Sequence, residues 1–355
     1  MNNIGGEKHI IIEEIKSQKD KWIQTIEEYY KAEKLLLANI TSSSDMYFVG
    51  TGSSYNNSLM AEFAYNKLMD KQAYSVNSSE YIFNPEVFIK PPYENKKIFV
   101  ISRTGETTDT LLAIEMLKRL NVFLISLTTF PNSSIAKNSN LSIVFENLRE
   151  ESITSNRVVS GIALFLLCLF YKLCGKESLI KKINDYSETF FINYNQYCSY
   201  ISSIIKSMDF SKFVFLGPGP LYSVAREAAL KVREMSITNT EFWPILEFRQ
   251  GYSTNVEEDN LVIAYLSKTN IGLQIKACME LKKAGAKILV ISDKARLENY
   301  EKFYDYILEI NIGLQDELLC QVYYQLFGQL IGYYQALKKN IDPSNPKNLD
   351  YIVRI

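Results

Sequence analysis

The sequence contains a single histidine, His9, among 355 residues. Histidine is the side chain that most often transfers protons near neutral pH, so any proton transfer here is expected to depend on carboxylates and lysines. The five cysteines show no CxxC spacing and have no histidine nearby. This pattern argues against a zinc site and fits a reducing cytoplasm, so we expect a cytoplasmic protein with no metal and no cofactor.

The sequence also lacks an excess of charge of either sign. Its 39 Lys and Arg residues and 40 Asp and Glu residues leave a formal net charge of −1, without a basic run, so nucleic acid is not an expected partner. The N-terminus shows no charged-then-apolar signal pattern. The apolar segment Val158–Cys174 is short for a membrane span and contains Ser160, Gly161 and Lys172. We therefore predict a buried core helix there and no membrane association.

A glycine-rich turn follows the first clear strand pattern. The apolar run Met46–Val49 ends in Gly50-Thr-Gly-Ser-Ser54, and a helical pattern extends from Tyr55 to about Met69. The free N–H groups and positive dipole of a helix N-terminus form an anion site, with Ser53 and Ser54 beside it. The same residues could instead only turn the chain and cap the helix.

A second turn of this kind follows another apolar strand, Ile98–Ser102, and precedes a helical pattern at 110–120. Ligands of parallel sheets bind outside the carboxyl ends of the strands, so two such ends can share one phosphate. The hydroxyl and guanidinium groups at this strand end belong to Ser102, Arg103, Thr104, Thr107 and Thr108.

Strand and helix patterns then repeat along the chain. Lys212–Pro220 is again a strand followed by a glycine-rich turn, and a helix is expected at 221–236. Alternation of apolar strands with amphipathic helices predicts an α/β protein with two tandem doubly wound α/β/α domains, each with a mostly parallel sheet. The expected strands are 46–49, 74–76, 97–102, 122–128 and 141–145 in the first domain, and 212–216, 261–266, 287–291 and 306–310 in the second. The predicted boundaries are a helical lead-in at 1–40, the first domain at 41–175, a helical linker at 176–208, and the second domain with a C-terminal tail at 209–355.

A charged stripe lies on the helix expected at 221–236. Glu227, Lys231 and Glu234 are spaced i, i+4 and i+7 and therefore share one face. Such a stripe is often a solvated face with ion pairs, and spacing alone leaves that interpretation open.

Two stretches resemble a known family. Ser102–Thr110 resembles the Ser-x-Ser-Gly-Glu-Thr-x-Asp-Thr signature of the sugar isomerase (SIS) family. Glu227–Glu234 is similar to the catalytic helix in the isomerase half of glucosamine-6-phosphate synthases. The resemblance covers nearly the whole chain and implies tandem SIS domains. It also implies that Glu234 is the general base and acid, that Lys231 is its electrostatic partner, and that Glu227 positions the substrate or the helix.

The resemblance further implies a phosphorylated sugar or aminosugar as ligand, and a homodimer with sites shared across subunits. The implied sugar contacts are Ile153 and Ser155, in the loop before the apolar helix. Arg103 stands where the glucosamine-6-phosphate synthases have glutamine, and Thr104 stands where the family usually has serine. The implied phosphate ligands are Ser53, Ser54, Ser102, Arg103, Thr104 and Thr107.

Two further sugar-handling positions depart from the family pattern. In Glu247–Tyr252, Gln250 stands in place of a histidine that opens the cyclic sugar, and glutamine cannot titrate. In the tail Pro346–Ile352, Tyr351 stands in place of a lysine.

The sequence supports two function classes. One is a glutaminase-free enzyme that acts on a phosphorylated aminosugar or sugar amine, as an aminosugar-phosphate isomerase or a sugar-amine-6-phosphate deglycase. The other is a binding or regulatory SIS protein that senses a sugar phosphate without turnover. A plain sugar-phosphate isomerase with a different ring-opening group is a third interpretation.

Overall fold

The computed structural model describes residues 9–293, 303–310, 312–313 and 316–354. The chain forms two compact units, and the boundary between them falls inside helix α9, Glu177–Ile192. The N-terminal unit contains Ser17–Asn184 together with the tail Asn348–Ile355. The C-terminal unit contains Asp185–Lys347 together with Met1–Lys16, which is described from residue 9. The tail, predicted to be part of the second domain, therefore belongs to the N-terminal unit.

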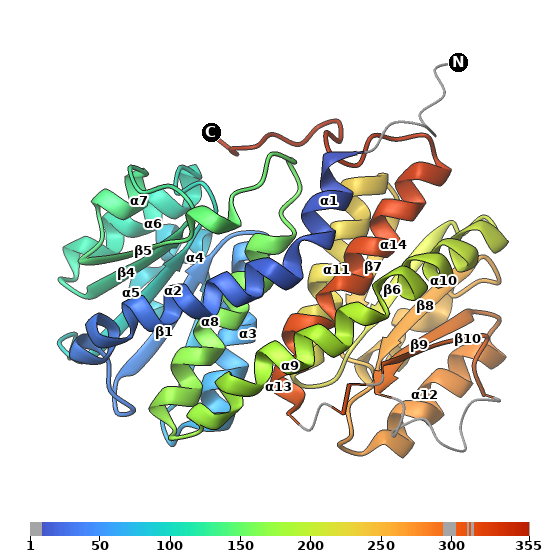
Figure 1. The fold of residues 1–355 in the computed structure, drawn as a ribbon, viewed down its shortest axis with the longest axis horizontal. Coiled ribbons are helices and arrows are strands. Elements are labelled where there is room, and N and C mark those ends of the chain that lie inside the picture. The colour runs from blue at the N-terminus through green and yellow to red at the C-terminus, as the bar shows by residue number, and fades with distance from the viewer. Residues whose placement is uncertain (1–8, 294–302, 311, 314–315, 355) are drawn as a thin grey trace. The chain divides into compact units, whose positions relative to one another are not determined.

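The N-terminal unit is built on a parallel sheet with the strand order β2-β1-β3-β4-β5 (Figure 1). The central strands are continuous apolar runs, as expected for a sheet that is covered by helices on both faces. The strands are β1 Asp45–Gly50, β2 Ala73–Asn77, β3 Lys96–Ile101, β4 Phe123–Thr128 and β5 Leu141–Val144.

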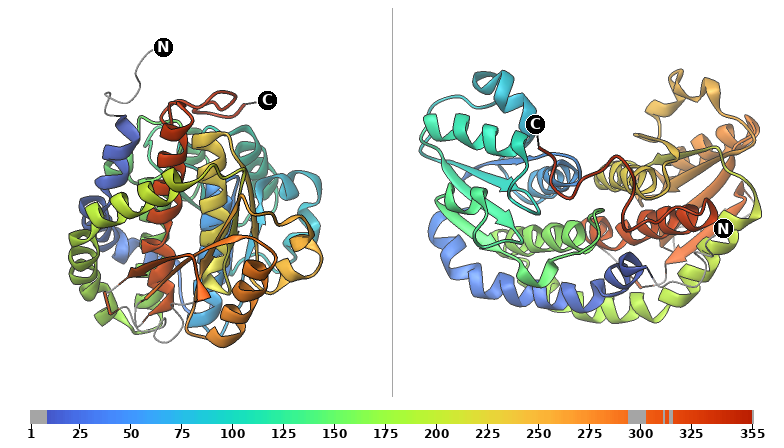
Figure 2. Two further views of the ribbon diagram at one scale, coloured as in Figure 1. Left: turned by 90° about the vertical axis from the view of Figure 1, so that its right-hand side faces the viewer. Right: turned by 90° about the horizontal axis from the view of Figure 1, so that it is seen from above.

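Helices cover both faces of this sheet (Figure 2). One face packs against α4, α6 and α7, and the other face packs against α3 and α8, with α2 against α8. Helix α8 is the predicted core helix. It is buried along most of its length, and its Ser160 accepts a hydrogen bond of 2.9 Å from the indole of Trp22. The helices are α2 Gln18–Asn39, α3 Ser53–Leu68, α4 Ser78–Phe83, α5 Pro85–Phe88, α6 Thr108–Arg119, α7 Ser134–Lys137 and α8 Arg157–Leu173.

The C-terminal unit repeats this architecture with the strand order β10-β9-β8-β6-β7, again all parallel. The predicted fold of two parallel α/β sheet domains is thereby confirmed. Strand β7 was not predicted, because the run Asn-Thr-Glu-Phe-Trp is polar and lies at the sheet edge, where it is only partly buried. The strands are β6 Lys212–Leu216, β7 Asn239–Trp243, β8 Asn260–Tyr265, β9 Lys287–Asp293 and β10 Tyr306–Ile310.

Residues 317–338 form two helices, α13 and α14, which meet at Tyr324. Helix α12 packs its apolar residues on one face of the sheet, and α11 packs closely on α14. The helices of this unit are α1 Ile10–Lys16, α10 Tyr194–Ser207, α11 Pro220–Ser236, α12 Ile271–Lys283, α13 Glu317–Tyr323 and α14 Gln325–Lys338.

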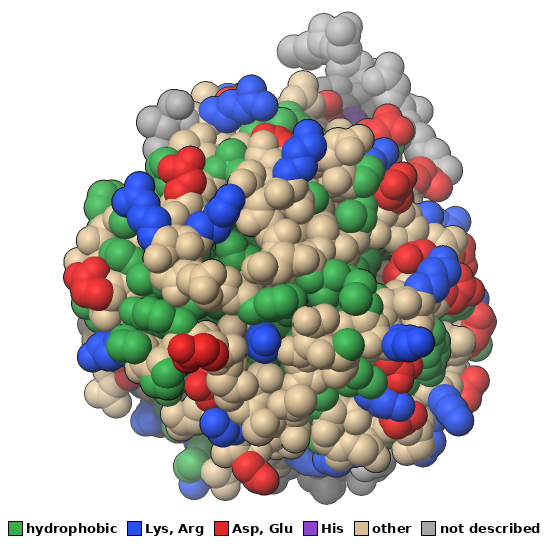
Figure 3. All heavy atoms as spheres, turned by 90° about the vertical axis from the view of Figure 1, so that its left-hand side faces the viewer, with side chains coloured by type: hydrophobic (Ala, Val, Ile, Leu, Met, Phe, Trp, Pro, Cys, Tyr) green, Lys and Arg blue, Asp and Glu red, His purple; other side chains and the backbone are tan. Residues whose placement is uncertain are grey.

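Two surface properties bear on the expected partners. On the face shown in Figure 3, Lys and Arg side chains are interspersed with Asp and Glu side chains, as the near-zero net charge predicts. Within the described part of the chain, none of the helices has both the length and the apolar character that a membrane span requires.

The close contact between α11 and α14 depends on Gly328, which has no side chain. A Cβ atom on Gly328 of α14 would lie 2.4 Å from the Cβ of Ala228 on α11. We therefore expect Gly328→Ala to destabilise the fold by about 1–3 kcal/mol, because the two helices would have to move apart. Gly272 of α12 is the control, since a Cβ there meets nothing within 4 Å, and Gly272→Ala should be neutral or slightly stabilising. Urea unfolding midpoints of the two variants would measure the difference; equal midpoints would contradict it.

Candidate functional site

The turn between β1 and α3 has the form of an anion-binding turn. A Cβ on Gly50 would lie 2.6 Å from the main-chain carbonyl carbon of Ser54, so only glycine fits. Gly52 precedes the helix with a φ of 58°, which glycine adopts without strain. Ser53 and Ser54 form the first turn of α3. The hydroxyl of Thr51 is buried and has no hydrogen-bond partner among the described residues.

The loop between β3 and α6 places its hydroxyl groups in a tight turn. The Ser102 hydroxyl accepts a hydrogen bond of 3.1 Å from the Gly105 N–H, and the Thr104 hydroxyl accepts one of 3.3 Å from the Glu106 N–H. Ser102 and Thr104 are both buried. Thr107 precedes the first turn of α6 without capping it through its side chain.

These two turns lie at neighbouring strand ends. Strands β1 and β3 are adjacent and parallel, with Val49 paired to Val100. The chain leaves β1 toward β2 on one side and later returns through β3 on the other side. This reversal is the topological switch point at which doubly wound sheets bind their ligands. The structure therefore brings the two groups of predicted phosphate ligands to the neighbouring ends of β1 and β3 in the N-terminal unit.

Arg103 lies in the same loop, but its guanidinium contacts main-chain oxygens. It donates to the carbonyls of Ser152 at 3.1 Å, Ile153 at 2.7 Å and Tyr351 at 3.4 Å. Its Cζ atom lies 4.2 Å from the centre of the Tyr351 ring. Arg103 thus joins two of the predicted sugar contacts, Ile153 and Tyr351, and its phosphate contact stays a prediction.

The loop that contains Ile153 and Ser155 is held by Glu150. This carboxylate is fully buried and accepts hydrogen bonds from the N–H groups of Asn156 at 2.8 Å and Arg157 at 2.6 Å. Because these amides begin helix α8, the negative charge also stabilises the positive end of that helix.

The charged stripe on α11 is buried rather than solvated. We call Glu227, Lys231 and Glu234 the α11 charge cluster. The Lys231 ammonium lies 2.5 Å from the carboxylate of Glu234 and 3.5 Å from that of Glu227. The side chains of Lys231 and Glu227 are 1% and 2% exposed, whereas that of Glu234 is 18% exposed. Glu234 is therefore the member that a ligand can reach, and Lys231 places a positive charge beside it.

Local sequence explains why α11 takes this form. A Cβ on Gly217 would lie 2.2 Å from the Leu221 carbonyl oxygen, so the turn into the helix requires glycine. Pro220 occupies the first turn, where its missing N–H has no cost. Ile237 ends the helix in the left-handed conformation, with its N–H donating to the Arg233 carbonyl.

Gln250 is not part of this cluster. It follows the short helix Glu247–Arg249 on an exposed turn, where its N–H donates to the Glu247 carbonyl at 2.8 Å. Beside this turn the rings of Trp243 and Tyr252 stack with centres 3.8 Å apart.

The cysteines are poor candidates for nucleophiles. All five are free thiols. Burial raises the pKa of Cys168, and it raises the pKa of Cys278 to about 12. Both thiols are protonated near neutral pH, and a thiol is a weak nucleophile in that form.

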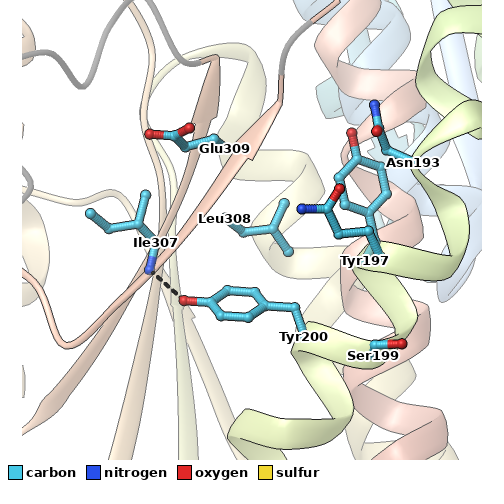
Figure 4. Close-up of a pocket in the computed structure, with 8 residues that line it drawn as sticks. Asn193, Tyr197, Ser199, Tyr200, Ile307, Leu308 and Glu309 are labelled. Carbon is cyan, nitrogen blue, oxygen red and sulfur yellow. Dashed lines mark hydrogen bonds between the residues drawn. The ribbon is translucent and has the colours of Figure 1, made fainter.

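Each unit contains a pocket. In the N-terminal unit, a pocket of about 280 Å³ is bounded by the 104–106 loop, by Phe130–Ser133 and by Tyr351 and Ile352 of the tail. In the C-terminal unit, a larger pocket of about 710 Å³ lies between α10 and the edge strand β10 (Figure 4). There the Tyr200 hydroxyl accepts a hydrogen bond of 3.1 Å from the Ile307 N–H. No predicted site residue lines this larger pocket.

The family model for the SIS domain matches the chain twice, at residues 39–169 and 209–338. With two parallel sheets, each carrying a glycine turn at its switch point, the protein is of the doubly wound α/β class. It belongs to the SIS domain family, with two SIS domains in tandem. The predicted family is confirmed.

Relatives with established names extend this comparison. The chain is 26% identical over its full length to the isomerizing glutamine–fructose-6-phosphate aminotransferase of Wigglesworthia glossinidia brevipalpis, of which it covers 60%. It thus spans somewhat more than half the length of that relative. The glucosamine-6-phosphate deaminase of Thermotoga maritima is 26% identical, with a TM-score of 0.76 over 97% of this chain and 99% of that one.

Solved structures with lower identity share the fold. The C-terminal domain of glucosamine-fructose-6-phosphate aminotransferase from Francisella tularensis has a TM-score of 0.83 at 22% identity, over 97% of this chain and all of that one. The tagatose-6-phosphate ketose/aldose isomerase of Escherichia coli has the same TM-score at 15% identity, over 98% and 97% of the two chains.

Two functional candidates were missed by the sequence analysis. Thr51 lies between the two glycines of the first turn, and its hydroxyl could have been counted with those of Ser53 and Ser54. Glu150 carries no local signal of its role in the sequence. Its contact with the α8 amides appears only when the loop is folded back on the helix.

Proposed function

We propose that this protein is a phosphosugar-processing enzyme that acts on a phosphorylated aminosugar or sugar amine, as an aminosugar-phosphate isomerase or a deglycase. Glu234 takes a proton from one sugar carbon and returns it to the neighbouring carbon. Lys231 stabilises the enediolate-like negative charge that develops between these steps. The observation that carries the proposal is the burial of Lys231 between two carboxylates, of which only Glu234 is partly exposed.

The cluster supports an enzyme better than a sensor. Burying an ammonium group and two carboxylates costs free energy. An exposed ion pair would stabilise the helix equally well without that cost, so stability alone does not explain the buried cluster. A preorganised cation beside a partly exposed carboxylate is instead what stabilises charge in a transition state. Phosphate binding by hydroxyls and amides alone would need no such cluster.

The phosphate is proposed to bind at the neighbouring ends of β1 and β3, held by hydroxyls and amides of the two turns. Ser53 and Ser54 supply the first turn, while Ser102, Thr104 and Thr107 supply the second. The family's relatives include proteins named for fructose 6-phosphate, glucosamine 6-phosphate and tagatose 6-phosphate, so a hexose 6-phosphate skeleton is the proposed substrate class.

Gln250 favours an open-chain substrate that contains a carbon–nitrogen bond. A cyclic sugar needs a group that transfers a proton at the ring oxygen, and glutamine cannot do so. An imine that is already open needs this help less. We further propose a cytoplasmic homodimer as the working form. The second candidate, a regulatory protein that binds sugar phosphates without turnover, is favoured by the same glutamine.

A thermal-shift screen tests the substrate class. We expect glucosamine 6-phosphate, or a phosphorylated sugar–lysine adduct, to raise the melting temperature more than inorganic phosphate at equal concentration. Ligand at 100 times its dissociation constant stabilises the folded state by about 2.7 kcal/mol. Fructose 6-phosphate and the unphosphorylated sugars serve as comparisons. If inorganic phosphate alone shifts the melting temperature, the proposed sugar specificity is wrong.

A further inference from the structure

The tail, residues 348–354, contacts the rest of the N-terminal unit at three points. The Tyr351 hydroxyl donates a hydrogen bond of 2.8 Å to the Glu150 carbonyl. The Tyr351 carbonyl accepts from Arg103, whose guanidinium also stacks on the Tyr351 ring. Two residues further on, the Val353 carbonyl accepts a hydrogen bond of 3.3 Å from the Thr108 N–H. Figure 2 shows the tail, in dark red, ending beside this unit.

Arg103 is the centre of this arrangement. Its side chain is 11% exposed and lies 3.9 Å from the fully buried carboxylate of Glu150. One face of the guanidinium is occupied by the Tyr351 ring, and its edge donates to carbonyls of the 150–153 loop and the tail. A guanidinium is suited to these contacts because it is planar, permanently charged and has several N–H donors. An amide lacks the charge, and an ammonium lacks the plane.

The contact joins two residues that are 248 apart in the chain, Arg103 of the β3–α6 loop and Tyr351 of the tail. A glutamine at 103 would have no charge to place over a ring, and a leucine at 351 would offer no ring to an arginine. Loss of either side chain would therefore remove the stacking.

We infer that Arg103 and Tyr351 form a latch that holds the tail on the β3–α6 loop before any ligand binds. The latch makes Arg103 a positioning residue. It fixes Ile153 and the tail around the loop whose hydroxyls are proposed to bind phosphate. The tail carbonyl of Val353 also takes one N–H at the start of α6, so the tail and the loop are ordered together. The effect on ligand binding rests on the proposed function, but the latch itself does not.

Hydrogen exchange of the Thr108 amide, which donates to the Val353 carbonyl of the tail, tests the latch directly. We expect this amide to exchange faster by about tenfold or more in Arg103→Gln and in Tyr351→Leu, because opening of the tail no longer has to break the stacked contact. Tyr351→Phe keeps the ring and should show a smaller increase. The double variant Arg103→Gln/Tyr351→Leu should raise the exchange rate by less than the product of the two single-variant factors, since the shared stacked contact cannot be lost twice.

The control is Lys97→Gln. This lysine lies 4.5 Å from the centre of the Phe123 ring at the other end of β3, in a comparable cation–aromatic contact away from the tail. In this variant the Thr108 amide should exchange as in the wild type. Wild-type exchange rates in Tyr351→Leu and Arg103→Gln would overturn the latch.

Binding measurements separate the latch from a direct phosphate contact. If Arg103 is a positioning residue, Tyr351→Leu and Arg103→Gln should weaken binding of glucosamine 6-phosphate by similar factors. If Arg103→Gln alone weakens binding of inorganic phosphate while the Thr108 amide stays protected, Arg103 is a phosphate ligand and the latch is overturned. Absence of sugar-phosphate binding to the wild type would refute the proposed function and leave the exchange result to decide on the latch.

Discussion

Replacing Glu234 with glutamine is expected to lower turnover of the sugar phosphate by about 10²- to 10⁴-fold, the usual contribution of a general acid–base group. Glutamine has nearly the same shape but cannot accept and return a proton. The Lys231 ammonium keeps an oxygen partner in the variant, so the helix and the ligand contacts should persist. Steady-state assays with glucosamine 6-phosphate, together with calorimetric titration of the same ligand, would measure the two effects.

Glu115→Gln is the matched control for Glu234→Gln. Glu115 is an exposed carboxylate on α6, and its replacement should change neither turnover nor binding. A Glu234→Gln protein that keeps wild-type turnover would remove Glu234 from the chemistry. Equal loss of binding and turnover would assign it to ligand binding instead.

Lys231→Met is expected to cause the largest loss of stability, about 3–5 kcal/mol, because it leaves two carboxylates near each other without their shared cation. The methionine side chain is of similar length, so lost packing contributes little. Lys231 is 1% exposed and Glu227 is 2% exposed. Water therefore cannot replace the missing partner of Glu227. The midpoint of urea unfolding would measure the loss.

A second substitution separates the charge from the packing. In Lys231→Met/Glu227→Gln the buried charge is removed with its partner, and part of the lost stability should return. Lys31→Met removes the lysine of an exposed i, i+3 pair with Glu28 and should leave the midpoint unchanged. A Lys231→Met protein as stable as the wild type would show that the α11 charge cluster does not hold the helix in place.

Features that depend on neighbours in the chain could be predicted from the sequence. The strand–turn–helix at Gly50–Ser54 follows from an apolar run that ends in glycines and hydroxyls, and the structure places its strand and helix within a few residues of the prediction. The spacing of Glu227, Lys231 and Glu234 likewise placed them on one helix face, because helical geometry fixes that relation. Spacing could not show that the face is buried. That depends on what packs against it.

Features that depend on distant contacts could not be predicted. The stacking of Arg103 on Tyr351 joins residues 248 apart, and no local pattern encodes it. Arg103 was therefore expected to be only an anion ligand. The polar edge strand Asn239–Trp243 lacked the apolar signal of a buried strand. The break between α13 and α14 at Tyr324 has no proline or glycine beside it to mark it in the sequence.

Proton exchange in heavy water measures most directly whether Glu234 shuttles a proton between sugar carbons. Glucosamine 6-phosphate and fructose 6-phosphate would each be incubated with the protein in D₂O and followed by proton NMR at carbons 1 and 2. We expect the wild type to replace a hydrogen at one of these carbons with deuterium for the substrate that it binds, and Glu234→Gln to leave it in place. A bound sugar phosphate that keeps its carbon-bound hydrogens with the wild type for as long as with Glu234→Gln would contradict catalysis by this residue and favour a binding protein.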